Sequence, residues 1–207
     1  MRVNVYVDGF NLYYGIKDTS HKWLNPLALT TRLLPEHTIN HIHYFTARIT
    51  APPDDPGKPQ RQDVFIRALS TIPNLTLHWG QFVSRPRRMP LVSPLADGTT
   101  MVEVMRTEEK GSDVNLATWL LLDGLQRKYE MAVVVSNDSD LVEPIRVVRA
   151  TLGLPVGVFN PQPFQHSSEL RKEAIFCRHI HAKAYAACQF PQELSDAKGI
   201  FRKPPEW

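Results

Sequence analysis

The 207-residue sequence is poor in cysteine, in excess charge and in long apolar runs. Its two cysteines, Cys177 and Cys188, argue against a disulfide-stapled secreted fold and fit a reducing compartment. No apolar run approaches membrane-spanning length, and Met1 leads directly into a β-like pattern without the apolar region of a signal peptide. We therefore expect a cytoplasmic protein that has no membrane partner.

Charge alone does not identify a binding partner. The chain has 24 Lys and Arg residues against 21 Asp and Glu residues, and a formal net charge of +3 is too small to prove a polyanionic ligand. The sequence is 43% hydrophobic, which at this length is enough to bury one sizeable core. It also lacks internal repeats and low-complexity tracts, so one α/β domain is the simplest expectation.

Strand-like and helix-like patterns alternate along most of the chain. Strands are expected at residues 3–7, 41–49, 75–82, 132–135 and 156–159, and helices at 25–34, 64–69, 113–129 and 141–150. In the long helix, the apolar residues that recur at three- and four-residue intervals are Val114, Ala117, Leu121 and Leu125. The alternation predicts a doubly wound, mainly parallel sheet.

Two segments interrupt or follow this pattern. Residues 85–106 form an irregular insertion, in which Asp97 and Gly98 suit a hairpin turn between β-like flanks. After Pro161 the pattern changes, and we expect a C-terminal extension over 162–207, with a helix around residues 174–187 and a disordered polar tail. The main domain is thus predicted to span residues 1–161.

Carboxylates occur at three places where a strand meets a helix. The segments are VYVDGFN after the first strand, EKGSDVN at the start of the long helix, and VVVSNDSDL after the strand at 132–135. Because the carboxyl ends of parallel strands border a shared crevice, the acids of these segments are expected to converge. The candidate catalytic residues and metal ligands are Asp8, Asp113, Asp138 and Asp140.

Acids packed together repel one another unless a cation offsets their charge. Carboxylate oxygens without matching His or Cys ligands favour a hard ion such as Mg²⁺ or Mn²⁺. One or two such ions can activate a water molecule and orient a phosphodiester. Taken singly, each of these residues can equally be a structural helix cap or turn residue, so the prediction depends on their recurrence.

Neighbouring polar residues fit the same chemistry. Asn11, Ser136 and Asn137 offer hydrogen bonds beside the acids, and Lys110 and Ser112 lie at the positive end of the long helix, where a phosphate can bind. A second group of candidate substrate-binding residues is basic, namely Arg85, Arg87 and Arg88, although a solvated loop explains these three arginines as well.

Aromatic and histidine residues leave two readings open. Phe10, Tyr13 and Tyr14 can stack single-stranded bases, but burial at the start of a helix explains them equally well. His41 and His43 share one face of a strand, which fits a half-exposed strand better than a ligand pair.

The motifs VDGFNLYYG, EEKGSDVNLA and VVVSNDSDL, in this order, resemble the NYN branch of the PIN-like nuclease superfamily. The resemblance covers roughly residues 1–161. It implies a PIN-like three-layer α/β/α sandwich that cleaves RNA with Mg²⁺ or Mn²⁺. The implied metal-binding acids correspond to Asp8, Asp113, Asp138 and Asp140, and Asn11 corresponds to the polar partner of the first motif.

The leading hypothesis from the sequence is a metal-dependent endoribonuclease, and two alternatives remain. One is a catalytically silent RNA- or protein-binding module on the same scaffold. The other, ranked lower, is a pyridine-ring monooxygenase of nicotine degradation, because some chains similar to this one carry that name. The sequence has no flavin-type glycine-rich fingerprint. The resemblance also implies a possible homodimer.

Overall fold

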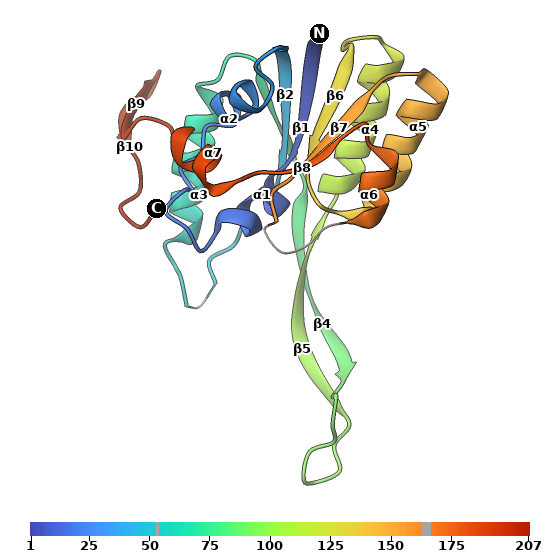
Figure 1. Ribbon diagram of the computed structural model, residues 1–207. Coiled ribbons are helices and arrows are strands. Elements are labelled where there is room, and N and C mark those ends of the chain that lie inside the picture. The colour runs from blue at the N-terminus through green and yellow to red at the C-terminus, as the bar shows by residue number, and fades with distance from the viewer. Residues whose placement is uncertain (53, 163–166) are drawn as a thin grey trace.

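A computed structural model describes residues 1–52, 54–162 and 167–207 of the chain. Its centre is a six-stranded sheet in the order β3-β2-β1-β6-β7-β8, in which every neighbouring pair of strands is parallel. The strands are β1 (Arg2–Asp8), β2 (Thr38–Thr46), β3 (Leu75–Trp79), β6 (Met131–Val135), β7 (Val156–Asn160) and β8 (Cys177–His179). The expected mainly parallel sheet is confirmed (Figure 1).

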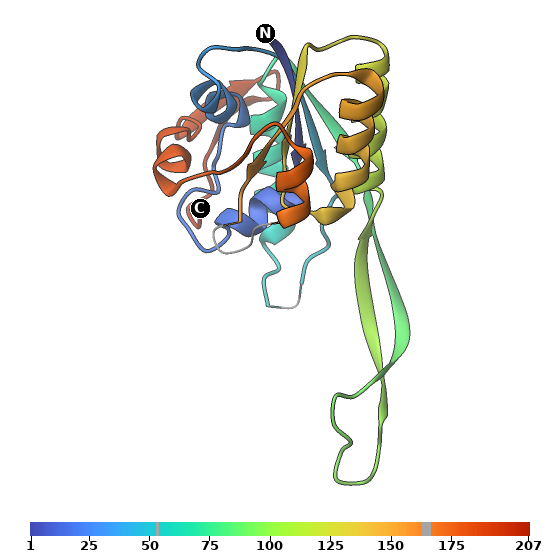
Figure 2. The same ribbon diagram turned by 45° about the vertical axis from the view of Figure 1, so that its right-hand side comes forward.

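Helices cover both faces of the sheet and produce the expected α/β/α sandwich (Figure 1, Figure 2). One face carries α1 (Gly9–Ile16), α2 (Pro26–Leu33), α3 (Lys58–Ser70) and α7 (Ala182–Ala187), and the other carries α4 (Ser112–Leu125), α5 (Val142–Leu152) and α6 (Ser168–Glu173). Side chains of β1 alternate between two apolar cores: Val3, Val5 and Val7 join the first, and Tyr6 joins the second. The described residues include no helix long and apolar enough to cross a membrane.

The order of the strands creates a switch point between β1 and β6. From β1 the chain winds outward through β2 to β3, and it later returns to β6 before winding outward through β7 to β8 on the other side. Val7 of β1 pairs with Val135 of β6, so the two strands end side by side. In open parallel sheets this position borders the ligand crevice.

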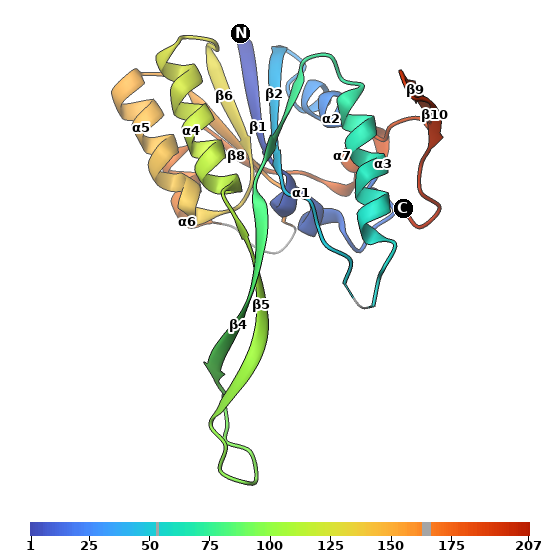
Figure 3. The ribbon, with the colours of Figure 1, turned by 180° about the vertical axis from the view of Figure 1, so that it is seen from behind.

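The predicted insertion is a long two-stranded arm. Strands β4 (Gln81–Pro90) and β5 (Met101–Lys110) pair in antiparallel register and extend away from the sandwich at the carboxyl edge of the sheet (Figure 1, Figure 3). The arm is therefore longer than the expected 85–106. Gly98 adopts a positive φ of 83° in its terminal loop, where the Asp97 carboxylate accepts a 2.9 Å hydrogen bond from the Thr99 amide.

Helix α4 does not bury the residues whose spacing identified it. Val114 and Leu125 are 70% and 65% exposed, whereas Leu116 and Leu120 are fully buried. The inward face continues through Asp123, which is also fully buried. A charged residue in the core-facing stripe masks the true apolar period, and this explains why the sequence pattern points to the wrong face.

The prediction of one helix over residues 174–187 is wrong. This segment contains β8 and α7, and the backbone amides before and after β8 bond to β7: Ile175 donates to Val156, and Ile180 donates to Asn160. The open edge of β7 provides hydrogen-bonding partners that a helix would leave unused. The tail then forms a hairpin of β9 (Glu193–Asp196) and β10 (Gly199–Arg202).

Candidate functional site

Asp8 is the last residue of β1 and the N-cap of α1. Its carboxylate accepts a 2.9 Å hydrogen bond from the Asn11 amide and a 2.9 Å hydrogen bond from the Ser136 hydroxyl. Burial raises the pKa of Asp8 above its usual range, while these hydrogen bonds act in the opposite direction. The carboxylate is therefore held in one orientation at the switch point.

The loop after β6 is organised around Ser136. Besides donating to Asp8, its hydroxyl accepts a 3.0 Å hydrogen bond from the amide of Asp138. Asp138 in turn accepts a 2.9 Å hydrogen bond from the amide of Asp140 and caps the short 3₁₀ helix η1 (Ser139–Leu141). One buried hydroxyl thus joins the first and third acidic segments.

Asn11 and Asn137 fasten the same loops together. The Asn137 amide donates a 3.1 Å hydrogen bond to the side-chain oxygen of Asn11. The side-chain oxygen of Asn137 accepts from the Ser167 amide at 3.0 Å, ahead of α6. Both residues lie at the predicted site, where they position its backbone.

Asp113, the second residue of α4, completes the acidic cluster. Its pKa is raised to about 6, first by burial and then by repulsion from Asp8, Asp138, Glu109 and Asp140. The structure therefore brings the other three predicted acids near Asp113, and Asp140 is the exposed member of the set. Glu109 is an additional neighbour whose side chain caps the start of α4.

The donor set fits a hard divalent ion that keeps part of its water shell. Among residues 1–52, 54–162 and 167–207, no three Asp, Glu, His or Cys side chains form a ready ligand cage. Mg²⁺ commonly needs only one or two protein carboxylates, with water and substrate oxygens completing its octahedron. Mutual repulsion among the acids also favours a cation there.

The predicted phosphate-binding groups at the start of α4 have protein partners. Ser112 is buried, and its amide and hydroxyl both donate to the Glu109 carboxylate, at 3.2 and 2.8 Å. The ammonium of Lys110 lies 3.0 Å from the Glu108 carboxylate, which also pairs with Arg106. Both donors of Ser112 are therefore engaged by Glu109, whereas Lys110 is an exposed cation that pairs with Glu108.

The arginines predicted to bind substrate lie on the arm. Arg85, Arg87 and Arg88 belong to β4 and are all exposed. Their cross-strand neighbours on β5 are Arg106, Val104 and Glu103, in that order. The structure places these three cations along an extension that begins at the acidic edge, rather than among the acids themselves.

A second polar cluster, centred on Asp123, is not predicted by the sequence. The Asp123 carboxylate accepts a hydrogen bond from the Tyr6 hydroxyl and contacts His43 Nε2, both at 2.9 Å, and pairs with Lys128 at 3.1 Å. The other ring nitrogen of His43 lies 2.8 Å from His78 Nε2. His43 is buried, contrary to the expected half-exposed strand face, because this carboxylate satisfies it. The one indication of this cluster in the sequence is Asp123 itself, an acid at a position of the long helix that faces the core.

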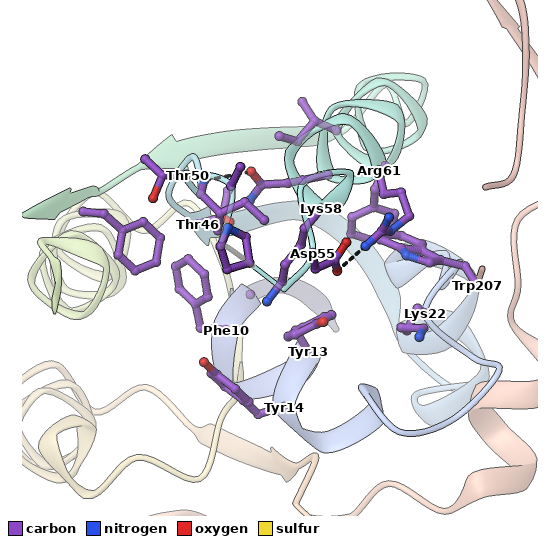
Figure 4. A pocket seen from close by; sticks show the side chains of 18 of the residues that line it. Phe10, Tyr13, Tyr14, Lys22, Thr46, Thr50, Asp55, Lys58, Arg61 and Trp207 are labelled. Atoms are coloured by element: carbon purple, nitrogen blue, oxygen red, sulfur yellow. Dashed lines mark hydrogen bonds and ion pairs between the residues drawn. The ribbon is translucent and has the colours of Figure 1, made fainter. Parts of the chain in front are cut away.

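An aromatic cavity of about 670 Å³ (Figure 4) is lined in part by Gly9, the residue that follows Asp8. Phe10, Tyr13 and Tyr14 of α1 line it, together with Lys58 of α3 and Phe82 at the base of the arm. Its size lies within the range of small-molecule binding sites. The three aromatic side chains of α1 are therefore partly accessible to solvent and not buried in the core.

Comparisons with known proteins give a family, one relative with a named activity, and one solved structure with a similar fold. A family model described as NYN domain matches residues 2–181. A Pseudomonas putida (strain DSM 28022 / S16) protein named 6-hydroxy-3-succinoylpyridine 3-monooxygenase HspA is 30% identical over 237 residues, covering 100% of this chain and 75% of that protein. The crystal structure of a protein of unknown function from Vibrio parahaemolyticus RIMD 2210633 is similar with a TM-score of 0.56 and 15% identity, covering 87% of this chain and 93% of that one.

Proposed function

The chain belongs to the NYN domain family, and from this premise we propose that it is a metal-dependent ribonuclease that hydrolyses RNA phosphodiester bonds. The observation that carries the proposal is the meeting of acids from three segments at the switch point: Asp8, Asp113 and Asp138. Gathering like charges costs free energy, and a purely structural cluster would gain little from it. The nuclease-type fold of the family supports the same conclusion.

The residues of the site have separable tasks in this proposal. Asp8, Asp113 and Asp138 hold Mg²⁺ or Mn²⁺, and Asp140 adds negative charge at the rim. When bound, the ion supplies charge compensation, lowers the pKa of an attacking water and stabilises the leaving oxygen. Ser136 keeps the Asp8 carboxylate and the Asp138 backbone at a fixed separation, which limits the reorganisation needed when substrate arrives.

The arm is proposed to guide the RNA backbone. Arg85, Arg87 and Arg88 offer exposed guanidinium groups along β4, and guanidinium groups bind phosphate oxygens in bidentate geometry. Because the arm starts at the carboxyl edge of the sheet, a strand lying along it would lead toward the acids (Figure 1). This geometry supports a nucleic-acid strand as the partner, and RNA is the member of that class that we propose.

The decisive experiment is cleavage of labelled single-stranded RNA, with matched DNA, in Mg²⁺, Mn²⁺ or EDTA. The wild type is expected to cut RNA only with a divalent ion, and Asp138→Asn is expected to be inactive while keeping its circular dichroism spectrum. Asp63→Asn, an exposed acid on α3, is the control and should cut normally. Cleavage in EDTA would contradict the proposal, and intact RNA in every lane would favour a silent binding module.

A second candidate function is oxidation of a small aromatic acid. It is favoured by the name of the Pseudomonas putida relative and by the aromatic cavity, where Lys58 and Lys22 can face a carboxylate. In such a reaction one oxygen atom of O₂ enters the ring, and two electrons from a nicotinamide reductant reduce the other to water. NADH oxidation that depends on both O₂ and 6-hydroxy-3-succinoylpyridine would establish it, and the absence of such oxidation would remove it.

A further inference from the structure

The aromatic cavity beside Asp8 has the composition of a site for a flat ring with an attached anion. Phe10, Tyr13 and Tyr14 present ring surfaces from α1, and Figure 4 shows them on one side of the hollow. Tyr14 is 57% exposed, so part of its ring surface is open to a ligand, although the Lys17 ammonium lies 5.5 Å from the ring centroid. A solvent-facing aromatic at a cavity mouth contributes little to folding and much to stacking.

Cations lie opposite these rings. Lys58, the first residue of α3, reaches toward Phe10 and Tyr13, and its ammonium lies 5.7 Å from the Tyr13 ring centroid (Figure 4). Within the described part of the chain, no acid lies within salt-bridge distance of Lys58. Arg61, by contrast, also lines the cavity but pairs with Asp55. Lys58 is therefore available to an anionic group of the ligand.

The position of the cavity links it to the acidic site. Gly9, which lines the cavity, directly follows Asp8, so the two sites share the start of α1. Phe82 and Thr107 from the base of the arm line its other side, and the Phe10 and Phe82 rings pack edge-to-face at 5.4 Å. A ligand seated here therefore contacts both the residue that follows Asp8 and the base of the arm.

We propose that this cavity binds one unstacked nucleotide of a single-stranded RNA, with the base against Tyr14 and Tyr13 and a phosphate at Lys58, adjacent to the cleavage point. The proposal rests on the ribonuclease function and narrows its substrate. A base within a duplex has both ring faces covered by its neighbours, and duplex RNA is recognised mainly through its backbone. The cavity therefore selects single strands.

The test is a binding measurement separated from cleavage. Each variant is made in the Asp138→Asn background and titrated in EDTA against a labelled ten-nucleotide RNA, alone and annealed to its complement. Tyr14→Ala should weaken binding of the single strand about tenfold, as expected for one lost stacking partner, and leave duplex binding unchanged. Tyr14→Phe keeps the ring and should retain the affinity of the Asp138→Asn protein. Leu125→Ala, equally exposed on α4, is the control.

Lys58→Gln gives an independent readout. Loss of one phosphate contact should reduce the slope of log affinity against log salt by about 0.7 for a single strand. Unchanged single-strand affinity in Tyr14→Ala would overturn the proposal, even where wild-type protein cleaves RNA normally. If RNA is neither bound nor cut while 6-hydroxynicotinate binds in a Lys58-dependent manner, the ribonuclease function fails as well, and the cavity serves a small aromatic acid.

Discussion

The hydroxyl of Ser136 donates a 2.9 Å hydrogen bond to the carboxylate of Asp8, across the boundary between the two central strands. The same oxygen accepts from the amide of Asp138. Both acids thus depend on a residue that is itself fully buried and out of reach of substrate. In the proposed function Ser136 is a positioning residue, and its removal should weaken metal binding more than it weakens RNA binding.

Ser136→Ala should weaken metal binding by about 10- to 100-fold, the usual cost of removing a partner that orients a ligand. The Mg²⁺ concentration that gives half-maximal cleavage should rise accordingly, and excess Mg²⁺ should restore most of the rate. Ser139→Ala, an exposed serine in η1, is the matched control and should behave as the wild type. An unchanged metal requirement in Ser136→Ala would refute the assigned role.

Asp113→Asn should stabilise the metal-free protein while impairing cleavage. The change removes one of the charges that repel Asp8 and Asp138, and we expect a gain of about 1 kcal/mol, or roughly 2–4 °C in Tm for a chain of this size. Thermal unfolding in EDTA at pH 7 measures it. Mg²⁺ should raise the Tm of the wild type more than that of the variant, and a lower Tm for the variant in EDTA would contradict this account.

Asp123→Ala should cost about 3–5 kcal/mol of unfolding free energy, because it leaves His43 and the Tyr6 hydroxyl buried without their acceptor. Asp63→Ala breaks the exposed pair with Arg48 and should cost no more than about 1 kcal/mol. Urea unfolding of both variants provides the comparison. Similar losses would mean that the buried cluster contributes little to the packing of α4 on the sheet.

The histidines beside Asp123 should make the protein sensitive to acid. Burial and repulsion from His43 lower the pKa of His78 to about 4, whereas in the unfolded chain it is near 6.5. The unfolded state therefore binds the proton first, and stability should fall as the pH drops from about 6.5 to about 4. Asp123 extends the loss below pH 4: burial raises its pKa, but bonds from His43, Tyr6 and Lys128 outweigh this and lower it to about 2.

Urea unfolding at pH 7.5, 5.5 and 4.5 measures this dependence. His78→Gln should flatten the curve between pH 6.5 and 4.5, and His181→Gln, an exposed histidine before α7, should not. A curve of equal slope in all three proteins would exclude His78 as the source.

The arginines of the arm should contribute electrostatic affinity for RNA. Replacing Arg85, Arg87 and Arg88 with Gln should reduce the salt slope for single-stranded RNA by up to about 2, since each lost phosphate contact removes about 0.7. The folded body should be unaffected because these side chains are exposed. A control with Arg32, Arg171 and Lys172 replaced removes the same charge elsewhere. Equal slopes for the two triple variants would argue against a specific role of the arm.

The sequence predicts well which strand ends lie at one edge of the sheet, because a parallel sheet brings strand ends together without reference to side-chain packing. Asp8 and Asp138 needed only the alternation of elements to be placed at one edge. Whether the polar groups beside these acids are free or already hydrogen-bonded was not predictable in the same way. Ser112 suits a phosphate-binding helix start, yet Glu109 bonds both of its donors, and nothing in the local spacing distinguishes the two outcomes.

Tertiary contacts explain the remaining failures. The inward face of α4 contains Asp123, and its burial is tolerable because distant residues bond to its carboxylate, among them His43, 80 positions earlier in the chain, and Tyr6. The strand at Cys177–His179 forms because β7 offers an open edge, a condition that local propensity does not encode. In both places a long-range hydrogen-bonding partner overrides a short-range pattern.

The central location of β1 also has a consequence for synthesis. The first strand to leave the ribosome pairs on one side with β2, but its second neighbour, β6, is made only after the arm and α4. Asp8 and Ser136 are 128 residues apart in the chain. Such distant pairing slows folding and leaves a hydrophobic strand open on one side. A nascent chain that ends within the arm thus contains Asp8 but not Asp113, Ser136 or Asp138, so the acidic cluster can form only after β6 and the loop behind it have been synthesised.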